Sequence, residues 1–262
     1  MKILELSYSP DSEKLFSVIA GEPWSVFLDS GFPNIDSGRF DIITARPSVT
    51  LETYDKKTYI KSITSETISE DDPFNLIREN LGNREDNLSG LPFCGGAIGY
   101  FSYDLCRRLE DLPNKTEQKI DMPDMAIGIY DWSIIVDHHA KRTWLVSFNR
   151  FDATKIIWHE LYELFSNITI EKDQGFRINS EIVSNLSKQD YANAFECIKE
   201  YIRNGDCYQV NFAQHFSAKF EGDTWSAYQK LRKSNPAPFS AYINLPSGSI
   251  LSSSPERFLS LN

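Results

Sequence analysis

A turn near residue 255 combines side chains that could perform acid–base chemistry. A predicted strand at 248–251 runs into three serines at 252–254, followed by Pro255 and then by the adjacent acid and base Glu256 and Arg257. The proline fixes the local backbone and removes one backbone donor, so this turn can hold a carboxylate in a fixed pose. The carboxylate can act as a general acid or base, but an exposed Glu–Arg ion pair has the same sequence. Residue chemistry alone leaves both interpretations open.

Two other segments resemble nucleotide or nucleophile motifs without their defining residues. The Gly-Gly-Ala-Ile-Gly segment at 95–99 has neither the GxGxxG spacing of a dinucleotide fingerprint nor the Gly-Lys-Ser/Thr ending of a P-loop. No GxSxG pattern indicates a serine nucleophile. The glycines at 95–99 are more typical of a strand that passes close to another backbone, which is the structure we expect here.

The cysteines and histidines form no metal or nucleophile pattern. No cysteine belongs to a CxxC pair or lies beside a histidine at metal-ligand spacing, so we expect reduced, mostly buried thiols and no metal site in this chain. His138 and His139 fall in a predicted hairpin turn, where exposed imidazoles are common. His215 lies at the end of a predicted strand, and we expect it on the surface of a sheet. The cysteines are Cys94, Cys106, Cys197 and Cys207.

Composition excludes several classes of protein. The 262 residues include 27 Lys and Arg against 37 Asp and Glu, a formal charge of −10. Binding to nucleic acid or a membrane surface requires clustered basic residues, so neither partner is expected. Hydrophobic residues make up 41% of the chain, enough for a packed core in one large domain or two smaller ones. No segment reaches the roughly 18 apolar residues of a membrane span, and we expect a cytoplasmic protein.

Short alternating strands separated by a few amphipathic helices predict an α+β fold built on antiparallel sheets. One helix is predicted to begin with Asp72 as its N-cap and Pro73 as its first residue. It is predicted to end at Gly82. Ser187 and Asp190 form a capping box at the start of another. We expect strands at 24–28, 39–45, 49–54 and 58–63, a hairpin of strands 125–136 and 143–148, a strand at 207–216, and helices at 73–81, 154–165 and from 187 to Gly205.

The segment 166–186 is polar with weak periodicity, which is typical of a linker. We therefore expect an N-terminal αβ region at 1–165 and a second region at 187–262.

Six separated blocks provide a more specific signal. Three of them, GGAIGY at 95–100, GDCYQVNF at 205–212 and SPERF at 254–258, together resemble the chorismate-utilising enzyme family. Within that family, RFDI at 39–42, PDMAIGIYDW at 123–132 and APFSAY at 237–242 resemble the members that aminate chorismate at its 4-position. The resemblance covers nearly the whole chain in the same order. It implies two orthogonally packed antiparallel sheets with helices on the outside, and it makes 187–262 the start of the chorismate-binding catalytic region.

The resemblance also implies an activity. Such enzymes replace the 4-hydroxyl of chorismate with ammonia, giving 4-amino-4-deoxychorismate on the route to para-aminobenzoate and folate. A glutamine amidotransferase subunit supplies the ammonia, and Mg²⁺ binds the substrate carboxylate. Glu256 matches the catalytic glutamate of the family, a general acid or base at the departing hydroxyl. Loss of hydroxide needs a proton donor, which a carboxyl group with a raised pKa can supply.

A second site is implied for L-tryptophan, which family members bind in a pocket away from the reaction. Phe40, Pro238 and Phe239 offer apolar walls for an indole, whereas Ser30 and Ser240 offer hydroxyls for the polar end of the amino acid. Ordinary core strands would show the same residues. The matching positions are Ser30, Ser37, Gly38, Arg39, Phe40, Pro238, Phe239 and Ser240.

Two departures from the family pattern limit this interpretation. The strand motif usually ends Gln-Arg-Phe, but Gln214-His215-Phe216 lacks the guanidinium. The 262 residues also lack the family's Pro-Ile-Lys-Gly-Thr segment with its lysine nucleophile, its metal-binding glutamates and its Gly-Ser-Ile-Thr-Gly-Ala-Pro-Lys loop. We therefore expect this chain to be catalytically incomplete. Two alternatives stay open: a member that makes anthranilate, and a non-catalytic module that binds tryptophan or docks a partner.

Overall fold

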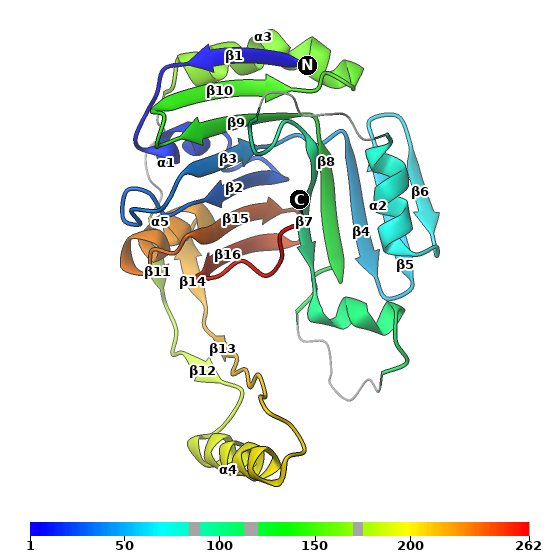
Figure 1. The fold of residues 1–262 in the computed structure, drawn as a ribbon, viewed down its shortest axis with the longest axis vertical. Helices are drawn as coiled ribbons and strands as arrows, with labels where there is room; N and C mark the ends of the chain where they lie inside the picture. The colour runs from blue at the N-terminus through cyan, green and yellow to red at the C-terminus, as the bar shows by residue number, and fades with distance from the viewer. Residues whose placement is uncertain (84–89, 113–119, 170–174, 262) are drawn as a thin grey trace. The chain divides into compact units, whose positions relative to one another are not determined.

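The computed structural model describes residues 1–83, 90–112, 120–169 and 175–261 (Figure 1). The chain divides into two compact units, Met1–Asp173 with Tyr228–Asn262, and Gln174–Ala227. These units differ from the expected division around 166–186, because strands from both ends of the chain pair within the first unit.

The first unit contains a seven-stranded antiparallel sheet in the order β1-β10-β9-β3-β2-β15-β16. Its centre joins distant segments, since β15 pairs with β2 so that Ser240 lies opposite Asp29. The edge strand β16 carries the chain toward Glu256. The strands are β1 (Lys2–Leu6), β2 (Ser25–Asp29), β3 (Phe40–Thr44), β9 (Trp132–Asp137), β10 (Arg142–Ser147), β15 (Phe239–Leu245) and β16 (Gly248–Ser254).

A second antiparallel sheet in the same unit has the order β6-β5-β4-β8-β7. The predicted hairpin at 49–54 and 58–63 forms β4 and β5. The glycine-rich segment forms β7, which packs closely against β8, confirming the close backbone approach expected there. The strands are β4 (Val49–Tyr54), β5 (Lys57–Ser62), β6 (Glu66–Ser69), β7 (Gly96–Phe101) and β8 (Met125–Tyr130).

The predicted continuous strand at 125–136 is wrong. Its first half, β8, lies in the second sheet and its second half, β9, lies in the first. The chain changes sheet at Asp131, whose buried carboxylate accepts hydrogen bonds from the backbone N–H groups of Arg150 and Phe151 at 3.2 and 3.0 Å. Both halves are buried throughout, so the break has no signature in the apolar pattern.

The two sheets cross steeply within the first unit, as the near-perpendicular arrows of β3 and β4 show in Figure 1. Buried residues from both sheets pack together where they meet: Trp24, Val26, Ala126, Tyr130, Ile243 and Leu245. This arrangement confirms the expected α+β fold with two orthogonal antiparallel sheets.

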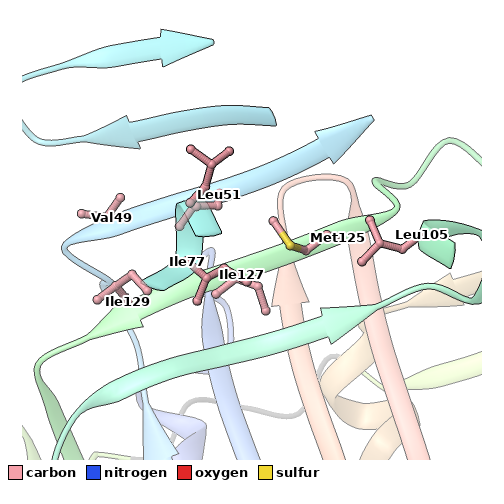
Figure 2. Packing of buried hydrophobic residues seen from close by; sticks show 8 residues of the cluster. Val49, Leu51, Ile77, Leu105, Met125, Ile127 and Ile129 are labelled. Atoms are coloured by element: carbon pink, nitrogen blue, oxygen red, sulfur yellow. The ribbon is translucent and has the colours of Figure 1, made fainter. Parts of the chain in front are cut away.

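Helix α2 (Pro73–Leu81) covers one face of the second sheet. The Asp72 carboxylate caps it by accepting hydrogen bonds from the backbone N–H groups of Phe74 and Asn75 at 2.8 and 3.0 Å, as the sequence predicts. Figure 2 shows Ile77 of this helix among apolar side chains of β4 and β8, such as Leu51 and Ile127.

The remaining helices of the first unit are short or peripheral. The predicted helix at 154–165 forms α3, where Leu161 and Phe165 are buried. Its hydrophobic side faces the first sheet, and the Trp132 and Phe165 rings lie 5.9 Å apart. The helices are α1 (Ser12–Ser17), the 3₁₀ helix η1 (Tyr103–Arg108), α3 (Asp152–Ser166) and α5 (Thr224–Ser234), which crosses the boundary between the units.

The second unit consists of two short strand pairs and helix α4 (Lys188–Asn204). The capping box of Ser187 and Asp190 and the left-handed Gly205 confirm the predicted helix limits. The predicted strand at 207–216 is wrong, because among the residues that the structure describes only its last residue pairs with another strand. The strands are β11 (Phe176–Ile178) with β14 (Phe220–Gly222), and β12 (Val183–Ser184) with β13 (Phe216–Ser217).

The contact between β7 and β8 gives a direct stability prediction. A Cβ atom at Gly99 would lie 1.9 Å from the backbone oxygen of Ala126, whereas one at Gly21 would meet nothing within 4 Å. We expect Gly99→Ala to lower the free energy of unfolding by about 3 kcal/mol or more and Gly21→Ala to change it by less than about 1 kcal/mol. Urea unfolding followed by circular dichroism measures both, and equal effects would contradict the close approach.

Candidate functional site

Ser30, expected in the tryptophan pocket, directly follows β2 and is buried. Its backbone N–H and its hydroxyl both donate to Oδ1 of Asp41, at 2.8 and 2.7 Å. Asp41 lies on the neighbouring strand β3 and is fully buried. The orientation of the Ser30 hydroxyl is therefore set by a carboxylate on the next strand.

The other carboxylate oxygen of Asp41 lies 2.8 Å from Nε2 of His138. Burial raises the pKa of Asp41, but hydrogen bonds from His138 and Ser12, the electrostatic influence of His138 and the Ser30 backbone outweigh it, leaving the pKa below its ordinary value. The hydroxyl of Tyr8 lies 3.2 Å from Nδ1 of His138. The expectation of an exposed imidazole at His138 is wrong, since this residue is 3% exposed and completes a buried polar network.

A second buried network surrounds Asp29 at the end of β2. The Asp29 carboxylate accepts hydrogen bonds from the Arg232 guanidinium, the Tyr228 hydroxyl at 2.9 Å and the Gly31 backbone N–H at 2.7 Å. Arg232 also donates to Glu13 at 3.0 Å. Burial and the charge of Asp29 raise the pKa of the Tyr228 hydroxyl. Burial lowers the pKa of Arg232, but the bonds to Asp29 outweigh it and keep the guanidinium charged.

The loop that follows β2 contacts both of these networks. Arg232 donates to the backbone carbonyl of Phe32, and the Phe32 ring stacks on His138 with centroids 4.1 Å apart. A side chain at Gly38 would place its Cβ 2.7 Å from the backbone oxygen of Ser30, so only glycine fits there without displacement. Of the expected pocket residues, the loop holds Gly38 inside and leaves Ser37 exposed.

Arg39 and Phe40 enter β3 from this loop. The Arg39 guanidinium lies over the Phe40 ring, 4.4 Å from its centroid, and pairs with Asp137 at 3.0 Å. Burial raises the pKa of Asp137, but the bonds to Arg39 and to backbone N–H groups outweigh it and lower the pKa below its ordinary value. The contacts with Phe40 and Asp137 therefore hold the Arg39 side chain in place, although 53% of it is exposed to solvent.

The second expected segment, Pro238, Phe239 and Ser240, lies at the start of β15. Ser240 is buried, lies opposite Asp29 in the sheet and donates to the Ala237 carbonyl at 2.9 Å. The structure thus brings Ser30 and Ser240 to the same end of two adjacent strands, although they are far apart in sequence. Phe239 is 38% exposed at the surface of this region.

Glu256, the expected catalytic residue, lies in an exposed turn after β16. The Ser254 hydroxyl donates to the Glu256 backbone carbonyl at 3.0 Å and shapes the turn. Arg257 lies over the Phe239 ring at 5.1 Å, and Glu256 forms no ion pair with any residue that the structure describes. The structure therefore does not contain the Glu–Arg pair that was the alternative interpretation.

Sequence reasoning missed several buried ionisable groups of the candidate site, among them Asp29, Asp41, His138 and Arg232. A partial signal existed, since Asp29 and Asp41 interrupt otherwise apolar strand patterns. Arg232 had none, because it lies on an amphipathic helix some 200 residues from its partner in sequence.

Three further expectations concern metals, thiols and membranes. Within the described ranges, no group of three or more His, Cys, Asp or Glu side chains could hold a metal ion. The four cysteines are free, but Cys197 is exposed and only Cys94 is fully buried, so the expectation of mostly buried thiols is wrong. In the part of the chain that the structure describes, no helix has the length and apolarity needed to cross a bilayer.

Comparisons with known proteins agree with the fold and the motifs. A family model described as chorismate binding enzyme matches residues 26–262. Aminodeoxychorismate synthase component 1 of Klebsiella aerogenes is 40% identical over 99% of this chain and 57% of its own length, and that of Escherichia coli (strain K12) is 40% identical over 98% and 56%. Anthranilate synthase component 1 of Acetivibrio thermocellus is 29% identical over 92% of this chain and 50% of its own length.

A solved structure supports the fold. The crystal structure of anthranilate synthase component I from Streptococcus pneumoniae superposes with a TM-score of 0.70 at 23% identity, covering 84% of this chain and 51% of that one. The chain spans about half the length of the curated relatives it matches.

The Asp29 network predicts the effect of removing its cation. Arg232→Met leaves Asp29 and Glu13 buried without their positive partner, so we expect a loss of about 3–5 kcal/mol in the free energy of unfolding. The exposed neighbour provides the control, and Lys233→Met should change the same quantity by less than about 0.5 kcal/mol. Urea unfolding measures both, and a loss below about 1 kcal/mol for Arg232→Met would show that Asp29 and Glu13 do not need the guanidinium as a partner.

Proposed function

Since this chain belongs to the family of chorismate binding enzymes, we propose that it provides component I of aminodeoxychorismate synthase. The proposed reaction converts chorismate and ammonia into 4-amino-4-deoxychorismate. The observation that carries the proposal is 40% identity, over nearly all of this chain, to relatives that bear that name. The anthranilate synthase relative reaches only 29%, which favours amination at the 4-position over the anthranilate alternative.

The proposed role of Glu256 is to move a proton at the oxygen that leaves the ring. Its carboxyl group is exposed at the end of an edge strand and free of any ion pair with a described residue, so a substrate hydroxyl can reach it. Loss of the 4-hydroxyl as water requires a proton on that oxygen, and a carboxyl group within hydrogen-bond reach can donate it. When ammonia bonds to the ring it forms an ammonium group, and the carboxylate can then accept the proton that this group loses.

The described residues do not fit a magnesium site, since they contain no cluster of three carboxylate, imidazole or thiolate ligands. No step is therefore assigned to Mg²⁺ on this chain. Ammonia would come from a glutamine amidotransferase subunit, as the name component 1 of the relatives implies a second component. The exclusion of nucleic-acid and membrane partners rests on the charge of −10, and the proposed location is the cytoplasm.

The region around Ser30 and Ser240 is proposed to bind L-tryptophan. The two hydroxyls lie at the same end of adjacent strands, and each donates to a protein acceptor while keeping lone pairs that can accept from an ammonium group. The three carboxylates of Asp29, Asp41 and Glu13 outnumber the two basic side chains that contact them, Arg232 and His138, so the local charge favours a cation. Phe40, Pro238 and Phe239 would contact the indole, with Ser37, Gly38 and Arg39 contributing the loop edge.

The activity proposal is tested with the complete product of the gene that encodes these residues. We expect it to consume chorismate in the presence of ammonia and Mg²⁺ and to form an aminated product. Glu256→Gln removes the proton donor and should lower kcat by about 10²–10⁴-fold, whereas the exposed Glu79→Gln on α2 should leave kcat unchanged. Full activity of Glu256→Gln would overturn the assigned role.

Calorimetry tests the tryptophan proposal on the 262-residue chain. We expect L-tryptophan to bind at one site per chain and Ser30→Ala to weaken binding by about tenfold, the cost of one hydrogen bond to a charged group. Ser166→Ala, an exposed position on α3, should bind as the unaltered protein does. Absence of heat with a folded sample, or equal affinity of the two variants, would contradict the proposed pocket.

A further inference from the structure

The second sheet carries a recess that the proposed function does not use. It has a volume of about 330 Å³ and lies over β4, β5 and β6, all within the first unit. Along β4, Val49 and Leu51 point into the core against α2, so the alternate residues line the opposite, open face. The lining residues are Thr50, Glu52, Tyr54, Tyr59, Lys61 and Glu66.

Glu52 is the least satisfied group in the recess. It is half-buried, and neither a hydrogen bond nor an ion pair links its carboxylate to any of the described residues. Burial raises the pKa of its carboxyl group, and the charge of Lys61 only partly opposes this effect. A partly desolvated carboxylate without a partner is unfavourable, so a bound cation would stabilise it.

The charges of the recess favour a cation rather than an anion. Lys61 pairs in register with Glu66 on the neighbouring strand β6, while Glu52 faces Tyr59 across β4 and β5. The recess therefore has two carboxylates and one ammonium group among its lining residues. The Lys61 ammonium lies within ion-pair distance of neither carboxylate. The recess carries one negative charge in excess when both glutamates are ionised.

Two tyrosine rings provide the second element of recognition. Tyr54 and Tyr59 meet edge to face, with centroids 6.1 Å apart and an interplanar angle of 80°. Tyr59 stands directly opposite Glu52 in the strand pairing. Aromatic faces attract cations through their quadrupole, and the attraction adds to that of a neighbouring carboxylate.

We propose that this recess is a binding site for an alkylammonium group. The ammonium would lie against the Glu52 carboxylate and its alkyl chain against the rings of Tyr54 and Tyr59. The volume lies at the low end of ligand pockets, which suits a short aliphatic amine or the end of a lysine side chain. The inference is independent of the proposed function, because the recess lies in a different sheet from Ser30, Ser240 and Glu256.

The test titrates the ¹⁵N-labelled 262-residue chain with n-butylammonium chloride and follows the backbone amide resonances of β4 and β5. We expect saturable shifts confined to these strands, and no saturable shifts with the neutral analogue n-butanol or with sodium chloride at equal ionic strength. Titration with Nα-acetyl-lysine methylamide distinguishes the two sources of the ligand. Binding of this compound indicates a lysine side chain, whereas its exclusion with n-butylammonium binding retained indicates a free amine.

Three variants make the assignment specific. Glu52→Gln should weaken n-butylammonium binding by about tenfold, because it removes the charge that the ligand contacts. Lys61→Met should tighten binding severalfold, since it removes the competing ammonium. Glu79→Gln, on the helix that covers the other face of the sheet, should have no effect. Each variant is compared only if its amide spectrum shows the native fold.

The proposal is overturned if n-butylammonium causes no saturable shifts in β4 and β5, or if n-butanol binds equally well. It is also overturned if Glu52→Gln and Lys61→Met change the affinity in the same direction, because opposite signs follow from the charge arrangement.

Discussion

The pairing of β2 with β15 is the constraint on which the candidate site depends. It joins a strand near the N-terminus to one that begins at residue 239 and sets Ser240 opposite Asp29. Without this register, Ser30 and Ser240 would not share one end of the sheet. β16 pairs with the other side of β15 and is the next strand of the sheet. It leads into the turn that contains Glu256. One backbone ladder therefore positions both proposed sites.

Buried charge reinforces this pairing. Arg232 links Asp29 at the end of β2 to Glu13 of α1 and to the loop carbonyl of Phe32. Asp41 in turn links Ser30 to His138, which lies just after β9. Buried ion pairs contribute little net stability compared with apolar packing, but they accept few alternative geometries. Here they connect the end of β2 and the loop after it to α1, to α5 and to the residue that follows β9.

Local patterns predicted the local structure well. The N-cap at Asp72, the capping box at Ser187 and the glycines of β7 each depend on a few neighbouring residues, and the structure confirms them. The change of sheet at Asp131 could not be predicted, because an unbroken apolar run is equally consistent with one long strand. The segment 207–216 has the alternation of a strand, but along most of its length no described segment pairs with it, and a strand requires a neighbour.

The serines and aromatic residues of the candidate site were predicted through motif resemblance alone. The structure places Ser30 and Ser240 at the same end of adjacent strands, and their role in binding stays a prediction. The buried partners were missed, because a carboxylate and a guanidinium some 200 residues apart produce no local sequence pattern. His138 was placed in an exposed turn, yet tertiary packing against Phe32 and Asp41 buries it.

The identity of the aminated product tests the central claim most directly. The complete gene product would be incubated with chorismate, ammonia and Mg²⁺, and the products separated by liquid chromatography with mass detection, with and without a lyase that releases para-aminobenzoate. The account predicts 4-amino-4-deoxychorismate, converted to para-aminobenzoate when the lyase is added. Formation of anthranilate without the lyase would contradict it.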